Sequence, residues 1–557
     1  MSRPDNSQAD SLDRAFLSTE FDVICIGGGL GGLAAAVRAS DLGMSVLVLE
    51  RADFVGGGAA YSGGLCWVPG RSDHEPPDSV EAADAYLDYV QGARDCDEEL
   101  RRAVLESARD AVDYFTDAGI PLEVVPGNPD VYYPHAPGST ATGRMLECAV
   151  GGESLGLWRQ QLLPSPHYRI GLRHSEFFDD SRAQAETAEL LSARQAEDFL
   201  TMGSGLAGAF VRAALIERSV ACLTGHRVIG LVSRQGRVAG VTAEGVDGQV
   251  TFTARRGVLI AAGGYGWSPD AADLEGLPDF VEAGPPSISG DNVTLAESVG
   301  AGIVRGGGPQ FSMGAYLEGE ERHPGSDEPL CVQLFDVMGM PHNLIVNRRG
   351  QRFGNESYYV GINEALKRWD ALGRHWENFP CYLILDDRFR QSYRLGNLAP
   401  GLPYPDDIVR AQTLEELATL VGIDDTALAE TLDRFNQYAD RGEDPDFGRG
   451  SLHFIRRRYG DQSHRPNANL GALREPPFYA IALRLLGTGM CTFGLQTDSQ
   501  GQVLRRDGSA VAGLYATGNA VATTEFRGYV TGYANTRNMT MAYQAANAMM
   551  AEDPSER

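Results

Sequence analysis

The sequence has little that would support metal or disulfide chemistry. Its eight cysteines are scattered along 557 residues, and none forms a CxxC or CxxCH pattern or a cluster with histidine. Zinc, iron–sulfur and c-type haem sites require such spacings, so none of these sites is expected. Isolated cysteines are typical of reduced, mostly buried thiols. We therefore expect a cytoplasmic protein without a metal centre.

Long apolar runs and clusters of basic residues are missing too. No segment approaches the ~20 apolar residues of a transmembrane helix. Residues 1–20 are polar and have no apolar centre, which predicts a loose N-terminal tail rather than a signal peptide. Acidic residues outnumber basic ones by 75 to 48, and the formal net charge is −27. Such a charge disfavours nucleic acid or an anionic membrane as a partner.

Glycine is plentiful instead, with 67 residues, and its clearest pattern lies near the N-terminus. An apolar run at 23–26 predicts a buried strand, and Gly27, Gly29 and Gly32 follow it as G-x-G-x-x-G. These glycines permit a tight turn, backbone approach to a pyrophosphate, and close helix–strand packing, in that order. A second apolar run ends at Glu50, which is placed to accept hydrogen bonds from a ribose. The segment therefore predicts an ADP-containing dinucleotide.

A second glycine-dense stretch, RADFVGGGAAYSGG, occupies residues 51–64 directly after Glu50. Backbone with so few side chains suits close contact with a flat ring system or with a second phosphate. A plain surface loop is the alternative, because Gly and Ser also mark loops.

The pattern changes from about residue 275, where Pro and Gly become frequent and the strand–helix–strand rhythm stops until about residue 510. Before the change, residues 228–257 predict a β-meander; within the changed region, Leu344–Phe353 predicts a hairpin. A chain of this length needs two or more domains. We expect an α/β, Rossmann-like domain that is split in sequence by an inserted domain. The expected limits are 1–20 for the tail, 21–274 and 471–557 for the two parts of the dinucleotide domain, and 275–470 for the insertion.

Several motifs are shared with one superfamily: GGGLGG with Glu50, GGGAAYSGG, VLIAAGGYGWSPD, GDNVTLAESVGA, LIVNRRGQRFGNES, PPFYAIALRLLGTG and TDSQGQVLRRDGSAVAGLYATGN. With them the chain resembles the FAD-binding fumarate reductase/3-ketosteroid dehydrogenase superfamily from about residue 20 onwards. The resemblance implies FAD in a domain of the glutathione-reductase type, and an α+β substrate-capping domain over the flavin. Covalently flavinylated members carry a His where this loop reads GGGAAYSGG, so non-covalent FAD is expected. The cofactor-binding residues implied by the glycine patterns and the resemblance are Gly27, Gly29, Gly31, Gly32, Glu50, Arg51, Gly57, Gly58, Ser62, Gly63, Gly64, Val228, Ala262, Gly263, Gly264, Asp291, Gly518 and Asn519.

Two positions favour the 3-ketosteroid Δ1-dehydrogenase-like branch over the fumarate reductases. Where the reductases have an HHTMGG-like segment, this chain reads LGTGMC from Leu486, which looks like the LGT of the ketosteroid branch. Where the reductases have a substrate-binding Arg, it has Tyr529. The match is imperfect after this tyrosine, since the ketosteroid enzymes usually continue with Pro-Gly.

Desaturation next to a carbonyl needs a group that polarises the carbonyl, a base for the α-proton, and an acceptor for the β-hydride, which is the flavin. The resemblance implies Tyr529 as the polarising donor, helped by a backbone N–H from Gly532 or Tyr533. It implies Tyr359 as the base, with Tyr133 as its supporting partner; Tyr358 stays an alternative base because the register is uncertain by one residue. The remaining substrate-binding candidates are Tyr132, Tyr358 and Arg527, where an arginine two residues before Tyr529 would pair with a substrate carboxylate.

The sequence therefore predicts an FAD-dependent dehydrogenase that introduces a C=C bond α,β to the carbonyl of a cyclic ketone. A 3-ketosteroid is the first candidate substrate, and a smaller ring such as cyclohexanone or 4-oxocyclohexanecarboxylate is the second. The expected partners are this small molecule and an external electron acceptor, which is a quinone, oxygen or a protein. The alternative functions are a fumarate- or enoate-type flavin reductase of a small unsaturated acid, and a flavoprotein that only senses or binds.

Overall fold

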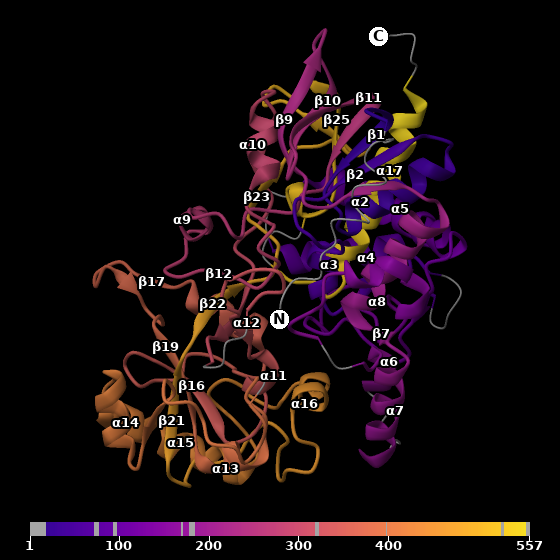
Figure 1. Cartoon of the computed structure of the whole chain (residues 1–557). Helices are drawn as coiled ribbons and strands as arrows, with labels where there is room; N and C mark the ends of the chain where they lie inside the picture. Colours follow the sequence, from indigo (N-terminus) through magenta and orange to yellow (C-terminus); the bar gives the residue numbers. More distant parts are fainter. Residues whose placement is uncertain are drawn as a thin grey trace.

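The computed structural model describes residues 18–71, 77–92, 97–168, 171–177, 184–317, 322–396, 398–524 and 528–552. Figure 1 shows two groups of elements. The first surrounds a large sheet and includes both the first strands and the last helix. The second is formed mostly by the middle of the chain. The N- and C-terminal parts thus fold together, as expected for a domain that is split in sequence.

The large sheet has eight strands, and its main path runs β24-β25-β11-β1-β2-β8. The pairs along the path from β25 to β8 are parallel, and β24 joins antiparallel at the edge. Parallel strands covered on both faces have continuous apolar runs, which explains why β1 and β2 are almost wholly buried. Strands β9 and β10 extend from β11 as the predicted meander, which is confirmed. The bounds are β1 Glu20–Ile26, β2 Val46–Leu49, β8 Ala221–Leu223, β9 Arg227–Arg234, β10 Arg237–Gly245, β11 Gly248–Ile260, β24 Gln502–Leu504 and β25 Ala510–Ala516.

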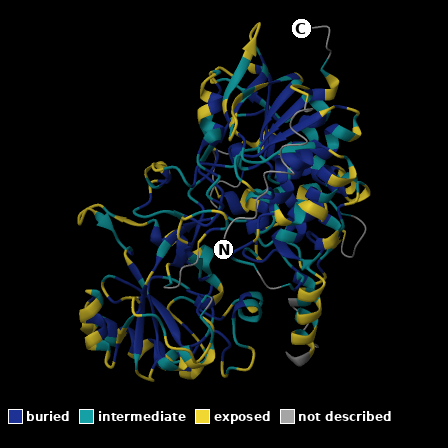
Figure 2. Ribbon diagram, viewed as in Figure 1, coloured by how far each residue is buried: buried dark blue, intermediate teal, exposed yellow. Residues whose placement is uncertain are grey.

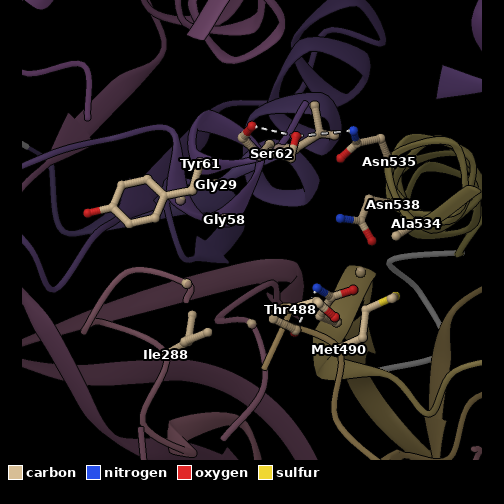
Figure 3. A pocket seen from close by; sticks show the side chains of 18 of the residues that line it. Gly29, Gly58, Tyr61, Ser62, Ile288, Thr488, Met490, Ala534, Asn535 and Asn538 are labelled. Atoms are coloured by element: carbon tan, nitrogen blue, oxygen red, sulfur yellow. Dashed lines mark hydrogen bonds between the residues drawn. The ribbon is translucent and has the colours of Figure 1, made fainter. Parts of the chain in front are cut away.

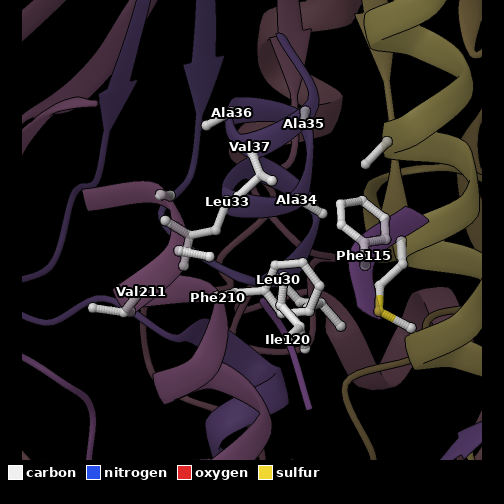
Figure 4. Close-up of a cluster of buried hydrophobic side chains, with 14 of the residues drawn as sticks. Leu30, Leu33, Ala34, Ala35, Ala36, Val37, Phe115, Ile120, Phe210 and Val211 are labelled. Atoms are coloured by element: carbon white, nitrogen blue, oxygen red, sulfur yellow. The ribbon is translucent and has the colours of Figure 1, made fainter. Parts of the chain in front are cut away.

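Helix α2 (Leu30–Asp41) begins at the glycine turn after β1 and is buried along most of its length. Its alanines keep the helix thin enough for close packing between the sheet and the last helix, α17 (Tyr533–Ala551). Figure 4 shows Leu30, Leu33 and Val37 of α2 among Phe115 and Phe210 from neighbouring helices. This core fixes the start of α2 against the end of β1, and so fixes the glycine turn between them.

The middle of the chain builds a four-stranded antiparallel sheet in the order β16-β19-β21-β20. Side chains on β16 (Asn343–Asn347) alternate between two cores: Leu344 and Val346 pack under helices α14 and α15, and Ile345 packs on the opposite face. In Figure 2 these strands are buried and the outer helices are exposed. The other bounds are β19 Cys381–Leu385, β20 Val409–Ala411, β21 Phe478–Ala482, α14 Leu414–Val421 and α15 Asp425–Arg441.

Residues 344–353 do not form the predicted hairpin: β16 pairs with β19, more than thirty residues later. The same region holds a second four-stranded sheet in the order β12-β22-β14-β15. Its strands are β12 Val281–Glu282, β22 Arg484–Gly487, β14 Phe311–Ala315 and β15 Val332–Gln333. We propose to keep the first domain limit near residue 274. Because β21 and β22 pair with strands of the inserted region, we propose that the second limit lies after Gly487 rather than at residue 470.

Among the described residues, no helix combines the length and apolar character needed to cross a membrane.

The other helices and strands complete the two groups of elements. Their bounds are α3 Gly57–Tyr61, β3 Cys66–Trp67, α4 Val80–Gln91, α5 Glu98–Asp117, β4 Leu122–Val124, β5 Met145–Cys148, β6 Val150–Gly151, α6 His174–Phe177, α7 Gln184–Ala196, β7 Phe199–Leu200, α8 Met202–Val211, α9 Ala271–Glu275, β12 Val281–Glu282, α10 Asp291–Glu297, β13 Ile303–Arg305, β14 Phe311–Ala315, β15 Val332–Gln333, α11 Phe335–Met338, α12 Tyr359–Leu366, β17 Trp369–Asp370, β18 His375–Trp376, α13 Asp387–Ser392, α16 His453–Tyr459, β22 Arg484–Gly487 and β23 Phe493–Leu495, with short 3₁₀ or π turns at Gly152–Gln160, Arg212–Glu217 and Gly518–Ala520.

Candidate active site

One cavity, of about 260 Å³, runs from the glycine turn after β1 to a group of tyrosines that come from three distant parts of the chain. Figure 3 shows part of its wall, with Gly29, Gly58 and Ser62 on one side, Thr488 and Met490 on another, and Asn535 and Asn538 of α17 beside them. The wall therefore combines segments from both groups of elements.

The glycines of the first turn have the structural roles that their spacing predicts. Gly27 has φ = +112°, and a Cβ added to it would lie 2.5 Å from the carbonyl oxygen of Ala261. A Cβ on Gly32 would lie 2.0 Å from the carbonyl oxygen of Gly27. A side chain at Gly32 would therefore separate α2 from the end of β1, and one at Gly27 would push the turn away from the end of β11.

The start of α2 offers a binding place for phosphate. Gly29 is the N-cap of the helix, and glycine has no side chain that could accept a hydrogen bond from the first amides of α2. Gly29, Leu30 and Gly31 line the cavity, so these amides are available to a ligand there. A Cβ on Gly57 would come within 2.9 Å of the Cα of Gly29, so the two glycine loops touch. Free amides and the positive end of the helix dipole suit a pyrophosphate.

Glu50 lies at the end of β2, on the wall of the cavity, and is only 6% exposed. Its two carboxylate oxygens accept backbone hydrogen bonds from Gly28, at 2.7 Å, and from Ala52, at 2.8 Å. Burial raises its pKa, and these hydrogen bonds oppose the rise. Each oxygen has a further lone pair, so a ribose hydroxyl can still donate to the group.

Replacing Glu50 with alanine is expected to weaken FAD binding by about 1–3 kcal/mol, because a charged acceptor is lost from a buried polar partner. The check is the FAD dissociation constant of reconstituted apoprotein, with Glu50→Gln as the matched control that retains one acceptor oxygen. Unchanged affinity in the alanine variant would remove Glu50 from the ribose site.

Most of the predicted cofactor-binding residues line the cavity. Arg51 lies at its edge and is held by Asp291, at 3.0 Å, whose other oxygen accepts from Arg227. Gly32 and Gly264 lie behind the wall, where a Cβ would meet Gly27 and Cys491. The predicted residues that line the cavity are Gly27, Gly29, Gly31, Glu50, Arg51, Gly57, Gly58, Ser62, Gly63, Gly64, Val228, Ala262, Gly263, Asp291, Gly518 and Asn519.

Asn535 and Asn538, which were not predicted from the sequence, line the cavity from the first turns of α17. Asn535 donates to the carbonyl of Leu65 at 2.9 Å, and the side-chain oxygen of Asn538 is buried without a hydrogen-bond partner. These asparagines follow the last strand of the parallel sheet, and ligands bind near the carboxyl ends of such strands. That position could have pointed to them. An orphaned buried oxygen on the wall fits a ligand that donates hydrogen bonds.

Three tyrosines meet at the other end of the cavity. The ring centroids of Tyr132 and Tyr359 are 5.4 Å apart, those of Tyr132 and Tyr529 5.7 Å, and those of Tyr359 and Tyr529 6.2 Å. All three line the cavity. Burial raises the pKa of Tyr132 and of Tyr359 well above the ordinary tyrosine value, and the neighbouring tyrosines raise that of Tyr359 further. Both phenols therefore hold their protons at neutral pH in the absence of a ligand.

The other predicted tyrosines do not line this cavity. Tyr133 packs beside Tyr86, with ring centroids 6.5 Å apart, whereas Tyr132 lies next to Tyr359. The hydroxyl of Tyr358 donates to the backbone carbonyl of Tyr132 at 2.5 Å, which leaves Tyr359 to face the cavity. Tyr533 is fully buried against Trp67. Arg527 lies outside the described residues.

Gly532, unlike Tyr533, lines the cavity and is the N-cap of α17. It has φ = +82°, and a Cβ would lie 2.9 Å from the amide nitrogen of Trp67, so only glycine fits there. The amide of Tyr533 already donates to the carbonyl of Val530 at 3.2 Å. Of the two backbone donors that the sequence suggested, Gly532 is therefore the better placed.

A cationic residue that the sequence analysis missed, Arg458, also lines the cavity. It lies on α16 with its guanidinium 5.4 Å from the ring centroid of Tyr459. Burial lowers the pKa of His174 to about 3, with a further contribution from Arg458, which places positive charge at this wall. Arg458 also opposes the burial-driven rise in the pKa of Asp336, so its charge is shared with that carboxyl. No motif singled it out, because residues 456–458 are three consecutive arginines, a pattern typical of a solvated face.

A split parallel α/β sheet, a glycine turn at a helix start and a buried acid after the second strand define a dinucleotide-binding oxidoreductase. The chain belongs to the FAD binding domain family, whose model matches residues 22–536. It is an FAD-dependent oxidoreductase, and the glycine cradle, the amides of α2, Glu50 and the asparagines of α17 fit that cofactor.

Curated relatives are similar along nearly the whole chain. The 4-oxocyclohexanecarboxylate 2-dehydrogenase of Sinomonas cyclohexanicum is 30% identical over 550 residues, which cover 96% of this chain and 93% of that protein. The 3-oxosteroid 1-dehydrogenase of Mycobacterium tuberculosis is 31% identical over 555 residues, covering 90% and 93%. Among solved structures, the 3-ketosteroid Δ1-dehydrogenase of Sterolibacterium denitrificans, in complex with 1,4-androstadiene-3,17-dione, superposes with a TM-score of 0.85 at 29% identity, covering 96% of this chain and 100% of that one.

Proposed function

We propose that this protein desaturates the ring of a cyclic ketone next to its carbonyl, with FAD as the hydride acceptor. The proposal rests on one observation: Tyr132, Tyr359 and Tyr529 lie together on the wall of the same cavity that the glycine turn lines. Its relatives by sequence are named as dehydrogenases of ring ketones, which supports the same reaction here.

The carbonyl would lie against Tyr529 and the backbone amide of Gly532. Both are hydrogen-bond donors on one wall of the cavity, and such donors stabilise the negative charge that develops on the oxygen during enolisation. A polarised carbonyl makes the neighbouring C–H more acidic. This pair therefore prepares the α-proton for removal.

Tyr359 would take the α-proton, and Tyr132 would orient it. Tyr132 is the immediate neighbour of Tyr359, and it is itself placed by Tyr459, whose hydroxyl lies 3.5 Å from its own. A base must lie within hydrogen-bond reach of the proton it removes, and a chain of hydroxyls holds Tyr359 in one position. Bound FAD supplies the acceptor for the hydride that leaves the β-carbon.

Denaturation with heat or acid is expected to release the FAD into solution. The loop 57–64 has no histidine, and the Nε2 of His174, which reaches the loop, lies 2.8 Å from the carbonyl oxygen of Gly63. The check is flavin absorbance in the supernatant after precipitation of the protein. Yellow colour that stays in the washed pellet would show a covalent bond and contradict this expectation.

The proposed reaction is tested by its product. Anaerobic incubation of the holoenzyme with a saturated ring ketone is expected to yield the α,β-unsaturated ketone in an amount equal to the flavin. With a ketone deuterated at the α and β carbons, the ring should lose one deuterium from each carbon. A saturated ketone recovered unchanged, together with reduction of an unsaturated acid by the reduced enzyme, would favour the fumarate- or enoate-type reductase instead.

Arg458 favours a ring that carries a carboxylate over a neutral steroid. Its charge lies at the cavity wall, where a substrate carboxylate would gain charge-assisted hydrogen bonds. Arg458→Met is expected to raise KM for a keto acid by about tenfold or more, the value of one such bond, and KM for cyclohexanone by less than about twofold. The measurement is steady-state kinetics with 4-oxocyclohexanecarboxylate and cyclohexanone. Equal effects on both substrates would contradict a carboxylate-binding role for Arg458.

The same comparison, applied to Arg527→Ala, tests the arginine that the sequence suggested for this role.

We further propose a cytoplasmic location and an external electron acceptor, which is a quinone, oxygen or a protein. Reoxidation of the reduced enzyme by a soluble quinone, by oxygen and by an electron-transfer protein, measured separately, would identify its class.

A further inference from the structure

A second, much smaller cavity lies behind the tyrosines. It has a volume of about 20 Å³, which is enough for one water molecule. Tyr359, Tyr529 and Thr488 line both cavities, so the hydroxyl-bearing side chains separate the two spaces. The small cavity is otherwise lined mainly by α12 and the residue after it, through Asn363, Glu364 and Lys367.

The spacing along α12 explains this arrangement. Tyr359 is the first residue of the helix, Asn363 follows four residues later, and Lys367 is its C-cap after another four. Residues four apart lie on one helix face, about 6 Å further along the axis at each step. One face of α12 therefore leads from the tyrosine at the large cavity towards the end of the helix.

Two oxygens on the wall of the small cavity lack partners. Asn363 is only 7% exposed; its amide nitrogen donates to the carbonyl of Phe311, and its side-chain oxygen has no hydrogen-bond partner. The hydroxyl of Thr488 is buried without a partner as well. Buried oxygens without partners are costly, and a water molecule in a space of this size would satisfy both.

The far end of the small cavity reaches the surface. Lys367 and Glu364 form an ion pair with a 2.7 Å contact, and the side chain of Glu364 is 59% exposed. A carboxylate in contact with solvent accepts protons and passes them on to water or buffer. The cavity thus joins Tyr359 to a group that exchanges protons freely.

The proposed reaction needs such a connection. Burial keeps the phenol of Tyr359 protonated, so it can take a proton from the ring only while it gives up its own. On the side of the large cavity the ring itself would lie against the phenol. The small cavity offers the proton a route on the other side of the phenol.

We propose that the small cavity holds a water molecule that carries the proton of Tyr359 past Asn363 to the Glu364–Lys367 pair and to solvent. The inference rests on the proposed function. In the step, the α C–H bond of the ring breaks and a new O–H bond forms on Tyr359, while the original phenolic proton moves to the water. The water passes one proton to the carboxylate of Glu364 and so to solvent. The β C–H bond breaks as well: its hydride leaves to the acceptor that bound FAD would supply, and the electron pair of the broken α C–H bond forms the C=C bond.

The test uses the holoenzyme and the rate of anaerobic flavin reduction by a saturating cyclic ketone. Asn363→Leu fills the cavity with an apolar side chain and removes the oxygen. It is expected to slow reduction by about tenfold or more and to increase the solvent deuterium isotope effect, while ketone binding changes by less than about twofold. Added imidazole or formate should restore part of the rate. Asn363→Ser keeps an oxygen and leaves room for the water molecule, so its rate of flavin reduction should fall less than that of Asn363→Leu.

Two further variants separate the relay from packing. Glu364→Gln is at the surface and leaves the core intact, and it should slow reduction by a few-fold with the same recovery in buffer. Ile362→Val changes packing on another face of α12, does not line the small cavity, and should leave the rate and the isotope effect unchanged. Wild-type reduction rates in Asn363→Leu, or slow rates that neither imidazole nor solvent isotope alters, would overturn the relay. No reduction of the wild-type flavin by any cyclic ketone would instead overturn the proposed function, and the relay with it.

Discussion

Tyr359→Phe is expected to lower the rate of flavin reduction by roughly 100- to 10,000-fold, the range for loss of a general base. The change removes one hydroxyl and keeps the ring, so the contacts of Tyr359 with Tyr132 and with Phe335, whose centroids lie 5.4 and 5.6 Å away, are retained. The fold and the FAD content should therefore stay normal. The measurement is stopped-flow absorbance of the flavin under anaerobic conditions.

Tyr358→Phe is the matched control, since the two tyrosines are adjacent and only Tyr359 lines the cavity. Loss of its hydrogen bond to the carbonyl of Tyr132 should cost less than about tenfold, because it affects the base only through its neighbour. If Tyr358→Phe were the damaging change and Tyr359→Phe were close to wild type, the assignment of the base would be wrong.

Tyr529→Phe is expected to lower the rate of flavin reduction by roughly 100-fold or more, because one of the two donors to the carbonyl is lost. The backbone amide of Gly532 is unaffected by this change, so some activity should remain. The dissociation constant of the ketone should change much less than the rate, because a carbonyl-polarising donor acts mainly on charge that develops in the transition state.

Tyr133→Phe serves as the control for Tyr529, since Tyr133 does not line the cavity. It should retain a rate within a few-fold of wild type. A near-normal rate in Tyr529→Phe would show that this hydroxyl does not polarise the carbonyl. Near-normal rates in both Tyr529→Phe and Tyr359→Phe would end the tyrosine-based mechanism.

The sequence predicted best what depends on neighbouring residues. The strand, glycine turn, helix and second strand that end at Glu50 are one local unit, and the conformation of Gly27 follows from the turn itself. The β-meander is local as well, with turns between consecutive strands.

The pairing of strands that are distant in the sequence could not be predicted. The strand at Asn343–Asn347 looked like the first half of a hairpin, but its partner is Cys381–Leu385, and the next strand of the sheet is Phe478–Ala482. Nothing in an apolar run of five residues identifies which distant run completes the sheet. The extent of the inserted region was uncertain for the same reason.

Side-chain direction outside regular structure was the other limit. Tyr132 and Tyr133 are adjacent in an irregular loop, where no periodicity tells which of them faces the cavity. Arg458 is the last of three arginines on a helix of seven residues, and only the packing of that helix brings it to the cavity wall. The residues that line the cavity near the glycine turn were thus largely predictable from motifs, and those at its tyrosine end were only partly so.

The measurement that tests the central claim most directly is anaerobic mixing of the yellow holoenzyme with saturated cyclic ketones, followed by absorbance at about 450 nm, since the flavin is the direct hydride acceptor. We predict rapid bleaching with at least one ring ketone and formation of one equivalent of its α,β-unsaturated product. A flavin that stays oxidised with every saturated ketone, while the chemically reduced enzyme is reoxidised by an unsaturated acid, would contradict the account.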